Sequence, residues 1–225
     1  MIGKLLRAVK IRLHPTPEQE IIFWKSAETA RWAYNFYLSE KERVYQEYLN
    51  NDMTGRKNIT SGEVRKYINN VLKKTTHKWL SEVGSNVMKQ GVLDAEEAYR
   101  RYFNGISGRP RFKSRRKSKI SFYVNYESLK RMQGGFQGEK LGFVRTSQPL
   151  PKIRKGQKYS NPRISYDGKY WYLSVGYEAK EEIKPELTGK SIGIDLGVKD
   201  FWQYCQTEEF SKISTKLMSA GLRRN

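Results

Sequence analysis

Cysteine and histidine are nearly absent from this sequence of 225 residues. The single cysteine, Cys205, cannot form an internal disulfide, and its isolation excludes a cysteine-based zinc ribbon within the chain. The two histidines, His14 and His77, stand far apart and have no partner at the spacing of metal ligands. We therefore expect no zinc, and no metal-binding or catalytic role for either histidine.

Long apolar runs and several common enzyme motifs are missing as well. No stretch approaches the roughly 20 apolar residues of a membrane span, and the N-terminus has no signal-peptide core. There is no P-loop, no Rossmann fingerprint and no nucleophile elbow. These absences favour a cytoplasmic protein and exclude the enzyme classes that depend on those motifs.

Acidic residues are too few to balance the basic ones: 23 Asp and Glu stand against 43 Lys and Arg, which gives a net charge of +20. A chain this basic repels itself unless a polyanion is close. Because the charge is clustered and interleaved with aromatic residues, nucleic acid is the first candidate for that partner. An anionic membrane surface is the second candidate. The third explanation needs no partner, because the charge could serve only to keep the protein soluble.

Periodicity predicts a strand and then a long helical block. Residues 5–13 alternate as a strand does, with Lys10 and Arg12 on the face opposite the apolar side chains. Residues 15–108 carry apolar side chains at helical spacing in three segments, two of which open with a capping-box pattern. The segments begin near Thr16, Thr60 and Ser85.

Beyond residue 108 the pattern changes to strands. Residues 120–126 alternate, and residues 163–178 are typical of a hairpin around the turn dipeptide Asp167-Gly168. A strand, a helical insertion and further strands together predict an α+β fold built on a β-barrel or sheet. The acidic and polar residues 178–190 are typical of a linker.

Two basic stretches are candidates for phosphate contacts. Residues 108–119 and 140–163 each carry seven Lys or Arg and no acid, and each phosphate contact would release a counterion. They flank the same predicted sheet region and could form one groove, although a solvated loop is the alternative for each. The candidate residues are Lys10, Arg12, Arg109, Arg111, Lys113, Arg115, Arg116, Lys117, Lys119, Lys152, Arg154, Lys155 and Lys158. Stacking platforms or core packing would equally explain Tyr123, Tyr126, Tyr159 and Tyr170.

The start of the third helical segment, "SNVMKQ", offers polar side chains for reading bases. Asn86, Lys89 and Gln90 lie close together there, and Asn or Gln can pair bidentately with adenine in a major groove. An ordinary solvent-facing surface explains the same residues.

The stretch "KSIGIDLGVKDF" sets one carboxylate, Asp195, into an apolar strand. A carboxylate buried there is costly unless it is paired or bound to a cation. Two-metal hydrolysis needs several carboxylates that converge on cations about 4 Å apart. Asp200 would lie on the opposite side of the strand, and Glu208 and Glu209 follow in a segment without a strand pattern. The sequence therefore predicts an incomplete metal site.

Four segments resemble, in order and spacing, the TnpB proteins of bacterial insertion sequences. They are "AVKIRLHPTPEQE", "ARWAYNFYLSEK", "GRPRFKSRRKSKISF" and "IGIDLGVKD", and the resemblance runs from about Lys4 to Asp200. TnpB proteins, once described as transposases with a helix-turn-helix, are RNA-guided DNA endonucleases related to type V CRISPR effectors. The resemblance implies guide RNA and double-stranded DNA as partners, no membrane, and a cytoplasmic, nucleoid-associated location in bacteria or archaea.

The resemblance also implies a domain plan. Residues 1–14 and 109–188 would form a β-rich wedge domain, with a helical recognition domain of helix-turn-helix-like start inserted at residues 15–108. Residues 189–200 would be the first strand of a RuvC domain, which has the RNase H-like fold, and Asp195 its first catalytic, Mg²⁺-binding carboxylate. The later catalytic acids of the family have no counterpart here. We therefore expect Asp195 to be vestigial and no metal to be bound tightly.

Residues 201–225 are expected to be an out-of-frame tail. Codons shifted by one frame from Phe201 encode leucine, alanine, isoleucine or valine, and leucine, which is the apolar strand that the family has at this point. We hypothesise a frameshift near residues 199–201 that truncates the chain, so that it binds guide RNA and DNA without cleaving. A non-cleaving RNA-guided or transposon-end DNA-binding regulator, a non-functional remnant and a product of programmed ribosomal slippage are the alternatives.

Overall fold

The computed structural model describes residues 5–154, 156–179, 194–195 and 203–204. The chain divides into two compact units, residues 1–181 and 182–225. In the first unit, strand β1 (Leu5–His14) leads into helix α1 (Pro17–Asn50). The helical block continues with α2 (Ser61–Tyr67), a π-helical turn (Ile68–Leu72), a 3-10 turn (Lys78–Ser81) and α3 (Ser85–Phe103). The later strands are β2 (Ser121–Tyr123), β3 (Lys130–Met132), β4 (Gly135–Gly138), β5 (Gly142–Thr146), β6 (Ser160–Tyr166) and β7 (Trp171–Ala179).

The seven strands of this unit form one antiparallel sheet in the order β2-β6-β7-β1-β5-β4-β3. The first strand in sequence therefore lies in the middle of the sheet, beside β7 and β5. All the helices in the described residues come between β1 and the remaining strands in the chain. This topology confirms the predicted α+β fold, in which a helical block interrupts a sheet after its first strand.

Helix α1 is one uninterrupted helix of 34 residues. It begins at the predicted capping box, where the Thr16 hydroxyl accepts from the Gln19 amide and the Gln19 side chain accepts from the Thr16 amide. The side-chain Nε2 of Gln19 also donates to the carbonyl oxygens of Leu141 and Phe143. These two hydrogen bonds fix the start of α1 beside β5. No glycine or internal proline interrupts residues 18–50. Residues 5–50 of this chain are therefore a strand followed by a single long helix.

Two hydrophobic cores share α1. In the first core, a row of buried side chains crosses β1, β7, β6 and β2, because these residues are directly paired in the register. The row consists of Ile11, Leu173, Ile164 and Phe122. Phe23 of α1 packs on this face, with its ring 5.8 Å from that of Phe122 and 5.2 Å from that of Trp171.

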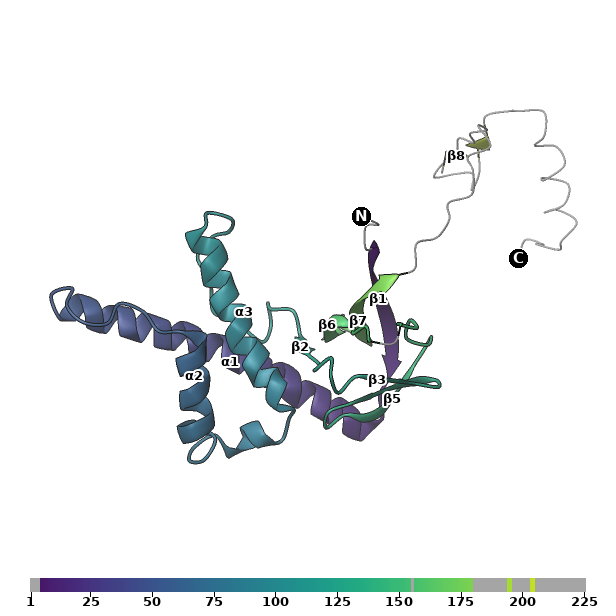
Figure 1. Ribbon diagram of the computed structural model, residues 1–225, viewed down its shortest axis with the longest axis horizontal. Coiled ribbons are helices and arrows are strands. Elements are labelled where there is room, and N and C mark those ends of the chain that lie inside the picture. Colours follow the sequence, from purple (N-terminus) through teal and green to yellow (C-terminus); the bar gives the residue numbers. More distant parts are fainter. Residues whose placement is uncertain (1–4, 155, 180–193, 196–202, 205–225) are drawn as a thin grey trace, which may run out of the picture. The chain divides into compact units, whose positions relative to one another are not determined.

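The second core lies farther along α1, where the helix packs against α2 and α3. Ala33, Tyr37 and Leu38 face this core from α1, and Val92 and Ala95 face it from α3. Figure 1 shows α1 extending from the sheet into the helical part, with α3 crossing it. The apolar stripes predicted for the first and third helical segments are thus confirmed as core faces over most of their length. Tyr45, Tyr102 and Phe103, at the far ends of these stripes, are exposed instead.

The crossing of α1 and α3 is close because α3 has no side chain at Gly91. A Cβ atom at this position would lie 2.7 Å from the carbonyl oxygen of Ala30 and 2.9 Å from the Cβ of Ala33. The first contact is with backbone, which cannot rotate away as a side chain can. Glycine is therefore required at this crossing for steric reasons.

Two parts of the sheet differ from the sequence prediction. The strand expected at residues 120–126 covers only Ser121–Tyr123, because Asn125 starts a turn in which its carbonyl accepts from the Ser128 and Leu129 amides. The meander β3–β5 was not predicted, because its strands are short and glycines interrupt their alternation. The hairpin of β6 and β7 is confirmed, with Asp167 accepting from the Lys169 and Tyr170 amides in the turn.

In the second unit, β8 (Ile194–Asp195) pairs antiparallel with β9 (Gln203–Tyr204). The sequence predicted a strand over residues 189–200 and no strand in the tail. Residues 194–195 form a strand as expected, and the partner of this strand, Gln203–Tyr204, belongs to the tail. The second expectation is therefore wrong at residues 203–204. The other residues of both predicted segments lie outside the described ones.

Among the described helices, none is long and apolar enough to cross a membrane.

We predict that Gly91→Ala destabilises the fold by about 1–3 kcal/mol, because the added methyl overlaps the α1 backbone. Urea unfolding followed by circular dichroism measures this difference. Gly62→Ala in α2 is the matched control, since a Cβ there meets only the Thr60 hydroxyl at 3.8 Å. We expect the control to be neutral or slightly stabilising. Equal stability of the two variants would contradict the close crossing.

Candidate nucleic-acid interface

The basic residues 108–119 lie along α1, held by three polar side chains at a spacing of seven residues. Glu42 pairs with Arg109 at 2.6 Å, and Glu28 lies 3.4 Å from Arg115. Between them, the Asn35 side chain donates to the Lys113 carbonyl at 2.9 Å and accepts from the Lys113 amide at 2.8 Å.

The lengths of the two elements explain this arrangement. Residues seven apart in a helix lie on nearly the same face, and fourteen residues of α1 rise about 21 Å. Six residues of extended chain, from Arg109 to Arg115, span about 20 Å. The basic segment can therefore run antiparallel to α1 with a helix side chain holding it near each end and in the middle.

This contact divides the basic residues of the segment into two groups. The Lys113 ammonium lies 3.8 Å above the Tyr34 ring, where burial lowers the pKa of Lys113 and the nearby Asp94 carboxylate opposes that shift. Lys113 is therefore part of the packing. Within the described part of the chain, the remaining cations of the segment are exposed and have no ion pair: they are Arg111, Arg116, Lys117 and Lys119.

The Arg163 guanidinium forms a bidentate pair with the Asp94 carboxylate, at 2.9 and 2.7 Å. Asp94 also accepts from the Gln90 side chain at 2.9 Å. This pair joins β6 to α3. It lies at a small cavity that Lys113, Arg115 and Lys119 also line, so Arg163 of the second basic stretch meets the first stretch here.

The other predicted cations of the second stretch are more dispersed. Lys152 and Arg154 are exposed in the segment between β5 and β6. The Lys158 ammonium lies 5.0 Å from the Tyr126 ring and 3.9 Å from the Glu127 carboxylate. Lys155 lies outside the described residues.

On β1, Lys10 and Arg12 both lie over aromatic rings. The Lys10 ammonium is 4.1 Å from the Tyr172 ring and the Arg12 guanidinium 3.4 Å from the Tyr170 ring. Lys10 is exposed and Arg12 is half-buried. One face of Tyr170 is thus occupied by a guanidinium.

The candidate stacking tyrosines have different environments. Tyr159 is buried, and its hydroxyl donates to the Pro151 carbonyl at 2.6 Å, so it is a core residue. Tyr123 lines the cavity beside Arg163, and Tyr126 is half-buried.

Two of the three candidate base-reading residues form internal contacts. The Asn86 amide donates to Glu139 at 3.4 Å and the Gln90 amide to Asp94 at 2.9 Å, and both side chains are half-buried. Lys89 is exposed. Of the three candidates, Lys89 is therefore open to solvent, whereas the side-chain amides of Asn86 and Gln90 are hydrogen-bonded to carboxylates.

Asp195, the candidate metal ligand, lies in β8 opposite Gln203. The described residues include no group of three or more His, Cys, Asp or Glu side chains that could hold a metal ion. They therefore do not supply the converging carboxylates that a pair of catalytic cations requires.

Comparison with known proteins connects this arrangement to a family. Residues 1–50 match the model of the helix-turn-helix domain of OrfB proteins from IS605 elements. "Putative RNA-guided DNA endonuclease InsQ" of Escherichia coli K12 is 25% identical over 87% of this chain and 46% of its own length. "Putative RNA-guided DNA endonuclease" of Streptomyces pristinaespiralis is 27% identical over 88% of this chain and 48% of its own length. The chain belongs to the TnpB family.

This TnpB-family chain spans about half the length of those two curated relatives. It is also 30% identical to the virulence protein VsdF of Salmonella dublin, over 49% of this chain and 89% of the relative. A chain in the cryo-EM structure of a Cas12f1-sgRNA-target DNA complex aligns with 96% of the chain and 60% of its own length. Its identity is 14% and its TM-score is 0.37, values too low to assign roles to residues.

Sequence reasoning missed the residues that position the basic segment of this TnpB-family protein. Glu28, Asn35 and Glu42 do not belong to either basic stretch, and a helical spacing of seven was the only signal that they share a face. Asp94 was missed because its partner, Arg163, is remote in the chain.

We predict that Asn35→Ala releases the middle of the basic segment and lowers the free energy of unfolding by about 1–3 kcal/mol, because two hydrogen bonds to backbone are lost. Hydrogen exchange at the Lys113 amide should accelerate. Asn69→Ala, at an exposed position of the π-helical turn, is the control and should change neither quantity. Unchanged exchange at Lys113 in the Asn35 variant would show that other contacts hold the segment.

Proposed function

We propose that this chain binds guide RNA and target DNA for a TnpB-type, RNA-guided activity, and that residues 108–119 form the main phosphate-binding surface. One observation carries the proposal: α1 holds this segment through Asn35, while four of its cations remain exposed and unpaired within the described residues. A segment fixed in this way presents its charge without the entropy cost of ordering a free loop.

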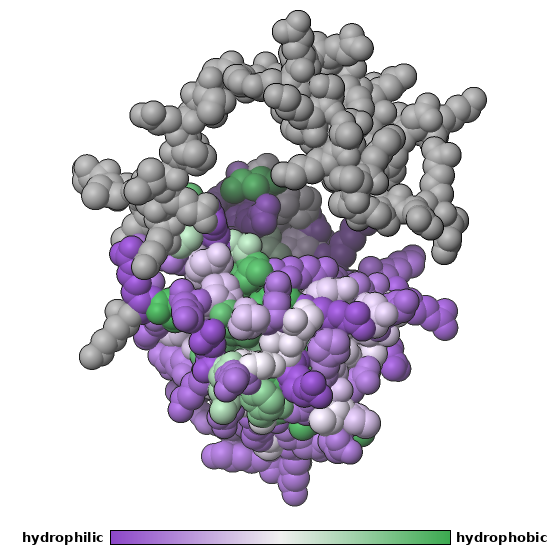
Figure 2. Space-filling model, turned by 90° about the vertical axis from the view of Figure 1, so that its right-hand side faces the viewer, coloured by the Kyte–Doolittle hydropathy of each residue, from purple (hydrophilic) through white to green (hydrophobic). Residues whose placement is uncertain are grey.

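The charges of the first unit favour a polyanionic partner. Lys or Arg that neutralises a phosphate releases a condensed counterion, so affinity rises with the number of such contacts and falls with salt. The exposed cations of residues 108–119, the Arg163 cavity beside them and Lys89 on α3 supply contacts of this kind. Figure 2 shows one face of the molecule, where hydrophilic residues cover most of the described surface and hydrophobic ones gather near its centre.

The relatives support RNA and DNA as the particular polyanions. Two of them are named as putative RNA-guided DNA endonucleases, and this chain covers 46% and 48% of their lengths. In the proposed arrangement, residues 5–179 bind the nucleic acids through phosphate contacts, and Asp195 is the one catalytic carboxylate that the family resemblance assigns. Magnesium would be the metal of the family reaction, but the described residues do not form a site for it.

We predict that the protein binds structured RNA and duplex DNA with a steep dependence on salt. Replacing Arg116, Lys117 and Lys119 with alanine should weaken binding and flatten the slope of log affinity against log salt by about 1 per lost phosphate contact. The control replaces Lys66, Lys74 and Lys78, exposed in the helical part, and changes net charge equally. Fluorescence anisotropy from low to moderate salt measures both variants. Equal losses would indicate a diffuse charge effect and contradict a defined surface.

We also predict that a polypeptide of these 225 residues binds target DNA without cutting it when Mg²⁺ is added. One carboxylate cannot hold two cations while leaving positions for the attacking and leaving oxygens. Incubating the purified polypeptide with a guide RNA and labelled duplex, followed by denaturing electrophoresis, tests this. Cleavage that disappears in Asp195→Ala would overturn the prediction.

A further inference from the structure

A second surface, away from Asp94 and Arg163, combines aromatic rings with cations. It is a pocket of about 510 Å³ between the second half of α1, the loop before α2 and the end of α3. Four aromatic rings line it, those of Tyr45, Tyr99, Tyr102 and Phe103. The volume falls within the range of small-molecule sites.

Two of these rings, those of Tyr99 and Phe103, are stacked, and the Tyr102 ring is tilted by 51° against that of Phe103. The Phe103 ring lies 6.0 Å from the Tyr99 ring at an interplanar angle of 23°, and the Tyr102 ring lies 5.2 Å from that of Phe103. Tyr99 is buried, whereas Phe103 is 70% exposed and Tyr102 is 38% exposed. A ring as exposed as that of Phe103 has a face available for a further aromatic group, and a nucleobase is a planar group of that kind.

The cations of the pocket are placed to meet a phosphate. Lys41, Lys57 and Arg109 line it, with Glu42 as the one acid. The Lys41 ammonium lies 4.8 Å from the Tyr99 ring and 5.8 Å from the Phe103 ring, and burial lowers its pKa. Arg109 is positioned by Glu42 at 2.6 Å. Three cations against one acid favour an anionic ligand.

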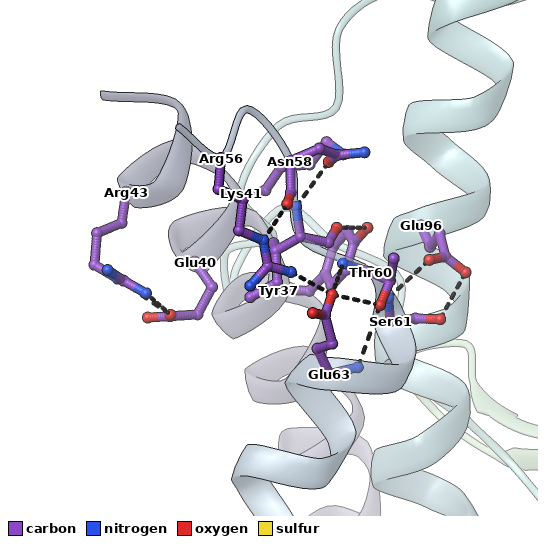
Figure 3. A network of polar contacts seen from close by, with 11 residues as sticks. Tyr37, Glu40, Lys41, Arg43, Arg56, Asn58, Thr60, Ser61, Glu63 and Glu96 are labelled. Atoms are coloured by element: carbon purple, nitrogen blue, oxygen red, sulfur yellow. Dashed lines mark hydrogen bonds and ion pairs between the residues drawn. The ribbon is translucent and has the colours of Figure 1, made fainter. Parts of the chain in front are cut away.

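The polar wall of the pocket is fixed before any ligand binds. Figure 3 shows the loop before α2 held by contacts with both neighbouring helices. Asn58 accepts from Lys41 at 2.5 Å through its side-chain oxygen, and its carbonyl accepts from Arg56 at 2.7 Å. The Ser61 amide and hydroxyl donate to Glu96 of α3 at 2.8 and 2.7 Å. A loop anchored in this way loses little conformational freedom on binding.

We infer that this pocket binds one unpaired nucleotide, with its base stacked on Phe103 and flanked by the tilted ring of Tyr102, and its phosphate near Lys57 and Arg109. The inference rests on the proposed nucleic-acid binding and adds a site that is specific for single strands. Charge favours a nucleotide over an aromatic side chain of a protein partner, because a peptide would not need three cations. Both RNA and DNA carry the required base and phosphate.

The experiment compares single-stranded and duplex probes. Labelled 12-nucleotide oligo-U and oligo-dT with a central 2-aminopurine serve as single strands, and a blunt duplex without unpaired bases serves as the reference. We expect the Tyr102→Ala, Phe103→Ala double variant to bind the single strands about 5-fold to 100-fold more weakly. Binding of the duplex should stay unchanged. Binding of the unmodified protein should quench the 2-aminopurine fluorescence, and this quenching should be absent with the double variant.

Two further variants keep the result interpretable. Phe143→Ala removes an exposed ring from β5, far from the pocket in sequence, and should leave single-strand affinity unchanged. Phe103→Trp, which restores a stacking surface in a Tyr102→Ala background, should recover part of the affinity if the double variant is folded. Thermal unfolding of each variant verifies the fold.

The outcomes separate this inference from the proposed function. If the unmodified protein binds neither probe, the proposed function fails. If it binds both with the expected salt dependence but the double variant keeps its single-strand affinity, the pocket inference alone is overturned. An equal loss on duplex and single strand would likewise overturn it. A loss confined to oligo-U or to oligo-dT would identify the strand that occupies the site.

Discussion

The rest of the structure depends on the close crossing of α1 and α3 at Gly91. The backbone of Ala30 and the methyl group of Ala33 leave no room for a side chain on α3 at this position. The same helix α1 contributes Phe23 to the sheet core and Tyr37 to the helical core. Because one rigid helix belongs to both cores, the crossing sets where α3 and its polar side chains lie relative to the sheet.

A few acidic side chains hold basic residues of this highly charged chain in place. Glu28 and Glu42 of α1 hold the two ends of the basic segment, and Asp94 of α3 holds Arg163 of β6. Of the three paired cations, Arg163 is half-buried, whereas Arg109 and Arg115 stay mostly exposed beside α1. Arg111, Arg116, Lys117 and Lys119 are exposed and have no ion pair within the described residues, so they can contact a polyanion directly.

Much of the fold could be predicted from the sequence where local chemistry decides it. The capping boxes at Thr16 and Thr60 and the turn at Asp167 lie where the pattern placed them. The meander β3–β5 could not be predicted, because its short strands are stabilised by pairing with one another and with β1 rather than by their own periodicity. The family resemblance came from four motifs and is confirmed by the matches to RNA-guided DNA endonucleases.

The sequence by itself determined the excess of positive charge, the starts of the main helices, and the family, since these depend on composition and on residues close together in the chain. Only the tertiary structure decided which cations are exposed and which are packed. Lys113 meets Asn35, and Arg109 meets Glu42, across sequence separations of 78 and 67 residues. Side chains so distant in the chain are brought together only when α1 packs in both cores. The sequence pattern of charges and apolar residues therefore cannot predict these contacts.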